Sequence, residues 1–393
     1  MTKVRVRLSG TNLPRAADHN QRVTLHAIRV HKSITRVALA RITGLTAPAV
    51  ANIAKRLLDE ELVIENGRLR QGRGQPGKVL QINPAARFSF GVNIDRDHVS
   101  IVLVNFTGEV VARRHRDSAF ALPAEVQAFW HEHAPTMVAE SGVAVDRLIG
   151  IGVAMPDDLG GIRMPGAPPS YSDWSRTDAT ELFAAPFAVP VFPENDAAAA
   201  ALGEQQFGCG PELSSALYIL LSSGLGGGLL IEGHYVRGAT GRSGEIGLIP
   251  VAGRDELVQD HVSISGLARV LGQAGLGLID LSRLDEDATV ASAWQGWLDG
   301  AVERLLPSLV AANCLINPAG IVIGARLPGA CTDQLAQALS DALGRIDPPL
   351  PANAPIRRAM LSDDAPAIGA AILPFNHALL PQSDTLWKDT AAL

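Results

Sequence analysis

The chain has 393 residues, of which 47% are hydrophobic and 19% charged, so it is long and apolar enough to form two or three domains with sizeable cores. Its net charge of −6 hides an asymmetry: basic residues exceed acidic ones by 11 in residues 1–87, and acidic exceed basic by 17 in residues 88–393. This division indicates a polyanion-binding head on a body that does not bind polyanions.

Nothing in the sequence indicates export or membrane insertion. The first residues, MTKVRVRLSG, lack an apolar stretch of the signal-peptide type. Polar residues, glycines or prolines interrupt the uncharged runs 213–231 and 305–325, whereas a membrane span needs about 20 mainly apolar residues. Cys209, Cys314 and Cys331 form no CxxC pair, which fits a reducing compartment. We therefore expect a soluble, cytoplasmic protein.

Residues 20–59 have the pattern of a helix–turn–helix. Residues 20–30 show helical spacing, and Ser33 or Thr35 can cap a second helix over 36–42. Gly44 lies where a tight interhelical turn needs positive φ, and Thr46 is a natural N-cap for the next helix. That helix carries a buried stripe at i, i+3 and i+7, made of Val50, Ile53 and Leu57.

The opposite side of this last helix suits the major groove of DNA. The side chains in its first turn are small, Asn52 can pair with adenine, and the cations of Lys55 and Arg56 can reach phosphates. Residues 62–65 and 68–71 then predict a hairpin with an Asn66-Gly67 turn and a basic wing at 72–78. We thus expect residues 1–87 to be a winged helix–turn–helix with a flexible N-terminus. Its expected DNA contacts are Arg36, Thr46, Ala47, Ala49, Asn52, Lys55, Arg56, Arg73 and Lys78. The alternative is a helical interaction domain with a solvated basic face.

From Phe88 onward, strands and Ala-rich helices alternate, which indicates an α/β body. Three motifs resemble the ROK family, a group of repressors, uncharacterised frames and sugar kinases: ENDAAAAALGE (194–204), SSGLGGGLLIEGHYVRGATGRSGEIG (222–247) and INPAGIVIGA (316–325). The resemblance runs from about residue 20 to about 371, and the head is similar to the repressor branch.

The resemblance implies a two-lobed, actin-like and hexokinase-like fold that holds a sugar in its cleft. It places lobe one at about 88–198 plus the C-terminal helix, and lobe two at about 199–370 of the 88–393 domain. It also implies a homodimer or homotetramer.

Family kinases hold ATP phosphates on a DxGGT hairpin, but this chain reads Asn93-Ile94-Asp95-Arg96-Asp97 there. A carboxylate 4 Å from one phosphate charge costs about 1 kcal/mol in water and about 4 kcal/mol at an effective dielectric of 20. The glycine amides also lose their close approach, although the second glycine loop, 222–228, is present. We therefore expect no ATP binding, no catalytic residue and no enzymatic activity.

The sugar pocket is better preserved. By the resemblance, Asn195, Asp196 and Glu245 bind sugar hydroxyls, and Asp196 is the base of the kinases. The alternatives are that Asn195 and Asp196 cap the following helix and that Glu245 is a surface acid.

Two departures from the family alter the pocket. Leu248 replaces a zinc-binding histidine, and the following stretch lacks the family's cysteines, so we expect no zinc and no other cofactor. His261 replaces a sugar-binding glutamate; as a ligand it would favour a sugar acid or phosphosugar, and otherwise it is structural. Trp174 could wall the pocket or pack in the core.

We therefore expect a sugar-responsive transcriptional repressor that binds an operator in double-stranded DNA and a small sugar, sugar acid or phosphosugar. A dimer would read half-sites about 34–36 Å apart, or a multiple of that. The alternatives are a ROK-type ATP-dependent sugar kinase with an accessory head, and a ligand-binding protein–protein module.

Overall fold

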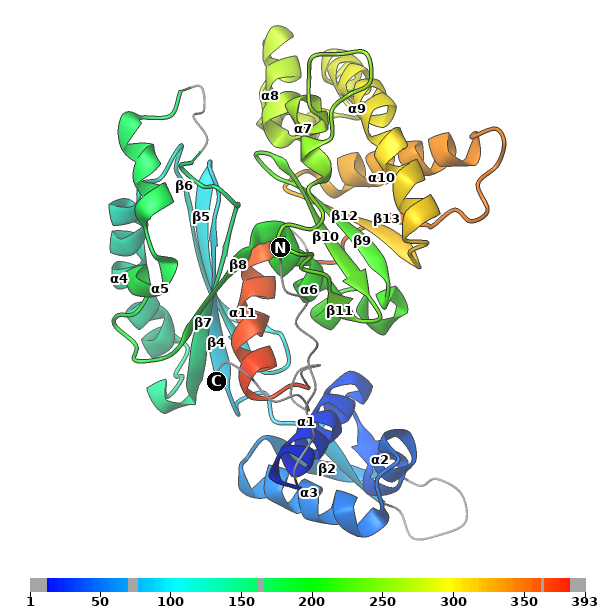
Figure 1. The fold of residues 1–393 in the computed structure, drawn as a ribbon. Helices are drawn as coiled ribbons and strands as arrows, with labels where there is room; N and C mark the ends of the chain where they lie inside the picture. The colour runs from blue at the N-terminus through cyan, green and yellow to red at the C-terminus, as the bar shows by residue number, and fades with distance from the viewer. Residues whose placement is uncertain (1–12, 70–76, 162–165, 362–363, 382–393) are drawn as a thin grey trace, which may run out of the picture.

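The computed structural model describes residues 13–69, 77–161, 166–361 and 364–381. They form a small head and a body of two lobes, each built on its own five-stranded sheet (Figure 1). The α/β class and the two-lobed actin-like and hexokinase-like architecture predicted from the sequence are confirmed.

The described part of the head contains three helices and a three-stranded sheet of order β1-β3-β2. Leu25 and Ile28 of the first helix and Val50, Ala54 and Leu57 of the third are buried in one apolar cluster, which holds the head together. In chain order the elements are α1 (Leu13–His31), β1 (Ile34–Thr35), α2 (Arg36–Thr43), α3 (Ala47–Asp59), β2 (Val63–Leu69) and β3 (Gly77–Ile82).

Local capping explains where α2 and α3 begin and end. Thr35 Oγ1 accepts a hydrogen bond from Ala38 N, and Thr46 Oγ1 accepts one from Ala49 N. Between the helices Gly44 has φ +70°, which permits the tight turn. Both predicted helices and the turn between them are confirmed.

Within the described ranges no single helix is long and apolar enough to span a membrane; α2 and α3 pass that test only as a pair bent by 116°.

The hairpin turn predicted at Asn66-Gly67 is wrong. Strand β2 continues through both residues, and its register against β3 shifts between Glu65 and Arg68. Gly67 has φ +77°, so the pair forms a β-bulge, which uses the same left-handed glycine conformation as a hairpin turn. The connection from β2 to β3 lies in residues 70–76, outside the described residues, and so does Arg73.

Lobe one contains a sheet of order β6-β5-β4-β7-β8, antiparallel from β6 to β4 and parallel from β4 to β8. Figure 1 shows α4 and α5 on one face of this sheet and α11 on the other. The elements are β4 (Phe88–Ile94), β5 (His98–Asn105), β6 (Val110–Asp117), α4 (Pro123–Glu140), β7 (Leu148–Met155), α5 (Ala179–Leu182), β8 (Val191–Asn195) and α11 (Ala365–Ala378).

Lobe two repeats this topology, with the order β11-β10-β9-β12-β13. Helix α6 packs on one side of the sheet, and α8, α9 and α10 enclose a large core on the other. The elements are α6 (Asp196–Phe207), β9 (Ala216–Leu221), β10 (Leu225–Ile231), β11 (His234–Tyr235), α7 (Val258–His261), α8 (Ile264–Gln273), α9 (Ala288–Leu315), β12 (Gly320–Ala325), α10 (Gly329–Gly344) and β13 (Ile356–Arg358).

The head packs directly on the body. Its apolar cluster also includes Phe106, Ile372 and Phe375 of the body. The guanidinium of Arg22 donates to the carbonyls of His377 and Leu380, at 2.9 and 3.2 Å. The end of α11 therefore fixes the position of α1.

Small residues bring α6 and α11 into backbone contact. Ala197 to Ala201 of α6 are all buried. A Cβ added to Gly369 of α11 would lie 1.7 Å from Ala199 O, and one added to Gly203 would lie 2.8 Å from the Cα of Gly369. The crossing therefore leaves no room for a side chain at either glycine.

We predict that Gly369→Ala lowers the free energy of unfolding of the body by about 1–3 kcal/mol, because the added methyl group overpacks this crossing. Gly296→Ala is the matched control, since nothing lies within 4 Å of its Cβ position in α9, and alanine there should be neutral or stabilise by up to about 1 kcal/mol. Urea unfolding measures both. Equal stabilities for the Gly369→Ala variant and the unmodified protein would contradict the close packing.

Candidate functional site

Asn195 and Asp196 lie at the junction of β8 and α6, between the two lobes. Asn195 Oδ1 accepts a hydrogen bond from Ala198 N at 3.0 Å and caps α6. Asp196 is the first helical residue and is only 7% exposed. The capping role considered for Asn195 is confirmed; contact of either residue with a sugar stays a prediction.

The carboxyl of Asp196 is poised to exchange a proton near neutral pH. Burial raises its pKa to about 7, and the nearby charge of Asp95 adds to this rise. The N–H of Ala197 and the cation of Arg96 oppose the rise without cancelling it. Such a group can accept a hydrogen bond from a hydroxyl, or a proton, at physiological pH.

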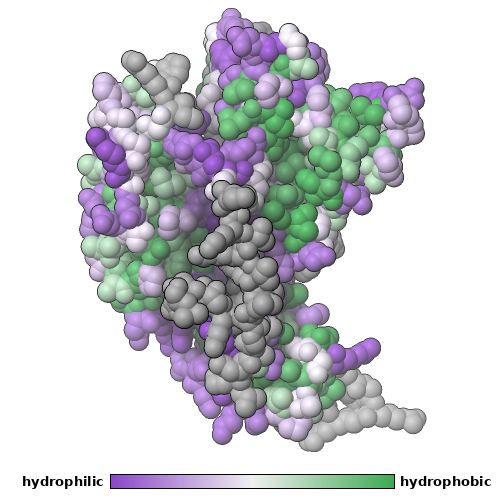
Figure 2. All heavy atoms as spheres, in the orientation of Figure 1, coloured by the Kyte–Doolittle hydropathy of each residue, from purple (hydrophilic) through white to green (hydrophobic). Residues whose placement is uncertain are grey.

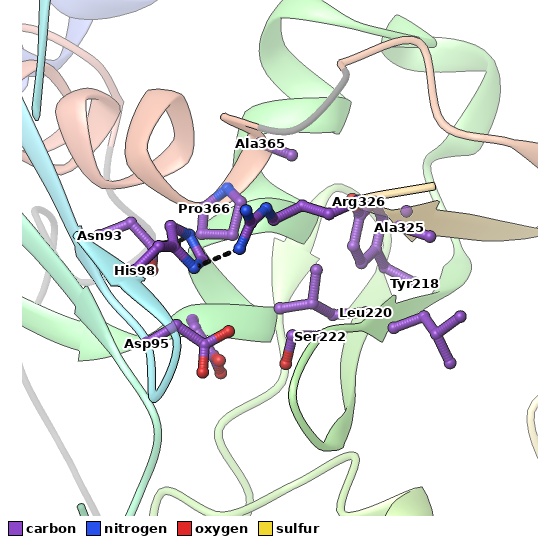
Figure 3. A pocket seen from close by; sticks show the side chains of 13 residues that line it. Asn93, Asp95, His98, Tyr218, Leu220, Ser222, Ala325, Arg326, Ala365 and Pro366 are labelled. Atoms are coloured by element: carbon purple, nitrogen blue, oxygen red, sulfur yellow. Dashed lines mark hydrogen bonds between the residues drawn. The ribbon is translucent and has the colours of Figure 1, made fainter. Parts of the chain in front are cut away.

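The turn between β4 and β5 is bound to lobe two by an arginine. Arg326 lies just after β12, and its guanidinium reaches His98 Nδ1 at 2.6 Å (Figure 3). The same guanidinium lies 3.1 Å from Asp97 Oδ1. Behind this pair, Asn93 Nδ2 lies 3.0 Å from His98 Nε2. Burial disfavours a charge on Asp97, but the His98 hydrogen bond and the Arg326 cation leave its pKa lowered. The β4–β5 turn, which stands where family kinases have their phosphate hairpin, therefore carries an ion pair between the lobes.

This cluster has the donor atoms for a divalent cation. Asp95, Asp97 and His98 present potential ligand atoms that all lie within 4.8 Å of one another. The Arg326 guanidinium already supplies positive charge to two of these three residues. Arg326 thus pairs with the carboxylate of Asp97, whereas Asp95 Oδ1 accepts a hydrogen bond from the backbone N–H of Arg96 at 2.7 Å.

A cavity of about 470 Å³ opens beside Asn195. Glu194, Asp157, Asp158 and Trp174 also line it. Trp174 is 3% exposed, and its indole N–H donates to Ala121 O at 2.8 Å, so this residue both walls the cavity and packs in the core. Figure 2 shows hydrophilic residues gathered where the two lobes approach each other.

Glu245 belongs to a second charged contact between the lobes. Arg242 Nη2 lies 3.0 Å from Glu245 Oε1, and Arg242 Nη1 lies 2.6 Å from Asp158 Oδ2, next to the 470 Å³ cavity. Burial and the charge of Glu245 raise the pKa of Asp157. Asn195, Asp196 and Glu245 thus all lie where the lobes meet.

Sequence reasoning missed Asp157, Asp158, Arg242 and Arg326. A partial signal existed for the two aspartates, which follow the predicted strand LIGIGVAMP directly. Arg242 reaches Asp158 and Arg326 reaches Asp97 across more than 80 positions of the chain, and no sequence pattern indicates these two pairings.

His261 packs against helix α9. Its Nε2 lies 3.0 Å from Trp297 O in α9, and its ring stacks on that indole with the ring centroids 6.1 Å apart. Burial lowers the pKa of the imidazole. This geometry fits the alternative of a structural histidine, and contact of His261 with an acidic ligand stays a prediction.

The residues present do not fit the zinc ion that the family resemblance raised. Leu248 has no donor atom, and no cysteine follows it in the stretch 249–268. Cys209 is far from this stretch in sequence, and its Sγ lies 2.9 Å from Glu204 Oε1. The donor set is therefore not that of a structural zinc site.

The exposed side of α3 presents the predicted DNA-binding side chains. Thr46, Ala47, Asn52, Lys55 and Arg56 are exposed, and Ala49 is half-buried. Arg56 Nη1 also donates to Gln21 Oε1 at 2.9 Å. The helix therefore offers a continuous surface of small, amide and cationic side chains.

Two further predicted contacts, Arg36 and Lys78, share one carboxylate. Arg36 Nη2 lies 2.8 Å from Glu65 Oε1, and Lys78 Nζ lies 2.5 Å from Glu65 Oε2. The hydrogen bonds from Lys78 and Arg36 lower the pKa of Glu65. Both cations are partly neutralised within the head.

Known proteins are similar to this chain over most of its length. The ROK family profile matches residues 89–376. An uncharacterized protein, y4fQ of Sinorhizobium fredii, is 30% identical over 91% of both chains. The xylose repressor of Bacillus spizizenii is 26% identical over 92% of this chain and 96% of its own.

A solved structure shares the fold. The crystal structure of a ROK family transcriptional regulator, described as a homologue of the Escherichia coli MLC protein, superposes with a TM-score of 0.68 at 19% identity. It covers 92% of this chain and 96% of its own, so the likeness in fold extends beyond the body to the head.

We predict that Asp196→Asn changes how stability depends on pH. Folding raises the pKa of Asp196 from about 3.9 in an unfolded chain to about 7. Between these values the folded protein holds a proton that the unfolded chain releases, so the stability of the unmodified protein falls by about 1.4 kcal/mol per pH unit as the pH rises.

The asparagine variant lacks this titration. Its stability relative to the unmodified protein should therefore increase on the order of 2–3 kcal/mol from pH 5 to pH 8. Urea unfolding at both pH values measures the difference. A relative stability that is the same at pH 5 and pH 8 would show that burial does not raise the pKa of Asp196.

Proposed function

The chain belongs to the ROK family, and from this membership we propose that it is a sugar-responsive, DNA-binding transcriptional regulator that acts as a repressor. The observation that carries the proposal is a basic helix–turn–helix packed directly on a two-lobed body that has a buried carboxylate between its lobes. The head that binds DNA and the body that binds sugar then share one apolar core, so that a change in the body can reach the head. A regulator of this kind works in the cytoplasm.

The interlobe ion pair supports a sensor in preference to a kinase. ATP phosphates would meet Asp95 and Asp97, and each pair of like charges at 4 Å costs about 4 kcal/mol at an effective dielectric of 20. Arg326 offsets charge there, but it is held by Asp97 and His98. The body thus keeps the sugar side of the family's cleft without the family's phosphate hairpin.

The competing function is a sugar kinase with an accessory head. Asp196, with a pKa of about 7, would be its general base, and residues 222–228 would hold the phosphates. Incubation of the full chain with ATP and a panel of hexoses and pentoses separates the two functions. Sugar-dependent release of ADP above a trace would establish the kinase; its absence from a protein that binds the sugar supports the repressor.

The effector is a small carbohydrate or a derivative of one. Asn195, Asp196 and Glu245 offer amide and carboxylate oxygens, and an ionised carboxylate forms short, charge-assisted bonds with hydroxyl groups. Xylose is the sugar in the name of one relative, so pentoses belong beside hexoses in any screen.

We predict that a matching sugar, at 100 times its Kd, stabilises the body by about 2.7 kcal/mol in a thermal-shift screen. Asp196→Asn should abolish this gain, because the amide cannot replace a charged acceptor. Asp173→Asn is the control, since Asp173 is an exposed carboxylate that pairs with Arg176. Equal stabilisation of the unmodified protein and the Asp196→Asn variant would contradict the assignment of Asp196.

The head binds operator DNA through α3, and we propose that a homodimer or homotetramer presents two such helices. Asn52 is the candidate for reading a base, whereas Lys55, Arg56, Arg36 and Lys78 are candidates for phosphates. Closure of the lobes on sugar would reorient the paired heads. A coupling free energy of about 1–3 kcal/mol would change operator affinity roughly 5- to 150-fold.

We predict that Glu65→Gln strengthens DNA binding at low salt and steepens its salt dependence. The substitution releases Arg36 and Lys78 for phosphates, and each phosphate neutralised adds about 0.9 to the slope of log K against log salt. Asp59→Asn removes the same charge from the end of α3 and serves as the control. Equal slopes for the two variants would show that the Glu65 pairs do not hold back DNA contacts.

A further inference from the structure

A second large cavity lies where the head meets the body. Its volume is about 890 Å³, and its lining residues do not include Asn195, Asp196 or Glu245 of the cleft. The head contributes α1 and β3, lobe one contributes the β5–β6 turn, and lobe two contributes the end of α6. The lining residues with polar side chains that bear on its chemistry are His26, Arg29, Lys32, Gln81, Gln205 and Gln206.

Arg29 enters this cavity without an acidic partner among the described residues. Its guanidinium lies over the ring of Phe207, 5.4 Å from the centroid, and its Nε is buried with no hydrogen-bond acceptor within the described ranges. Burial lowers its pKa to about 10. Glu109 lines the same cavity, but its Oε2 accepts a hydrogen bond from Asn105.

His26 repeats this feature one turn earlier on the same face of α1. Its Nδ1 is buried and has no hydrogen-bond partner in the part of the chain that the structure describes. Burial and the charge of Arg29 lower its pKa to about 4. Buried polar groups are normally hydrogen-bonded, and a buried cation is normally paired, so two neighbouring exceptions on one cavity wall point to a missing anion.

We propose that this junction cavity is a second ligand site, which binds a small organic anion through Arg29 and His26. The anionic group is a carboxylate or a phosphate, both of which match the planar donor array of a guanidinium. The amide side chains of Gln81, Gln205 and Gln206 offer donors and acceptors for the hydroxyl groups of such a molecule. The volume accommodates a ligand of metabolite size.

An anion bound here would contact the head and both lobes at once. Its binding would therefore favour one orientation of α1 relative to the body. The site lies at the opposite end of α6 from Asp196, so it stands independently of the sugar cleft and of the proposed effector.

Calorimetric titration of the full chain at low ionic strength tests the proposal, with inorganic phosphate, glucose 6-phosphate and gluconate as probes and glucose as the uncharged control. We expect at least one organic anion to bind more tightly than inorganic phosphate. Arg29→Met should weaken that binding at least tenfold, whereas Arg345→Met, which removes an exposed cation at the end of α10, should leave it unchanged.

The NMR signal of His26 should shift on binding in the unmodified protein and in Asp196→Asn alike, which separates this site from the sugar cleft. If Arg29→Met does not fold, His26→Gln provides the same comparison. Two results would overturn the proposal. One is that the Arg29 or His26 variant binds the anion as tightly as Arg345→Met does. The other is that no probe binds at concentrations up to about 10 mM.

Discussion

Helix α6 is the element on which the arrangement of the body depends. Its alanines 197–201 are all buried, and its backbone is in contact with that of α11 where Gly203 meets Gly369. A rotation or translation of α6 therefore requires a movement of α11. Its first residue, Asp196, lies in the cleft between the lobes, and its last residues line the junction with the head. Because α11 carries the contacts to Arg22 of α1, the cleft and the head are linked by two helices in close contact.

Two arginines of lobe two form ion pairs with lobe one across this cleft. Arg326 pairs with the β4–β5 turn, and Arg242 pairs with Asp158 in the turn after β7. Both ion pairs join the lobes directly and lie partly in solvent, where such pairs are individually weak. A ligand can therefore alter the separation of the lobes at small cost, which suits a sensor that must exist in two states.

The limits of sequence reasoning follow from the range of each interaction. Thr35, Gly44 and Thr46 act on neighbouring residues, and the helices they bound were predicted closely. Asn66-Gly67 was misplaced because a hairpin turn and a β-bulge use the same glycine conformation, and only the pairing with β3 separates them. The direction of the His261 ring depends on Trp297, 36 residues away. The family resemblance supplied Asn195, Asp196 and Glu245, but the arginines that surround them required the structure.

The central claim is that sugar in the cleft and DNA on the head are energetically coupled through the body. The direct measurement is the affinity of the full chain for its operator with and without saturating sugar, together with its affinity for the sugar with and without operator. Linkage requires the two ratios to be equal, and we expect a factor between about 5 and 150. Two ratios of one, in a protein that binds both ligands, would contradict the account.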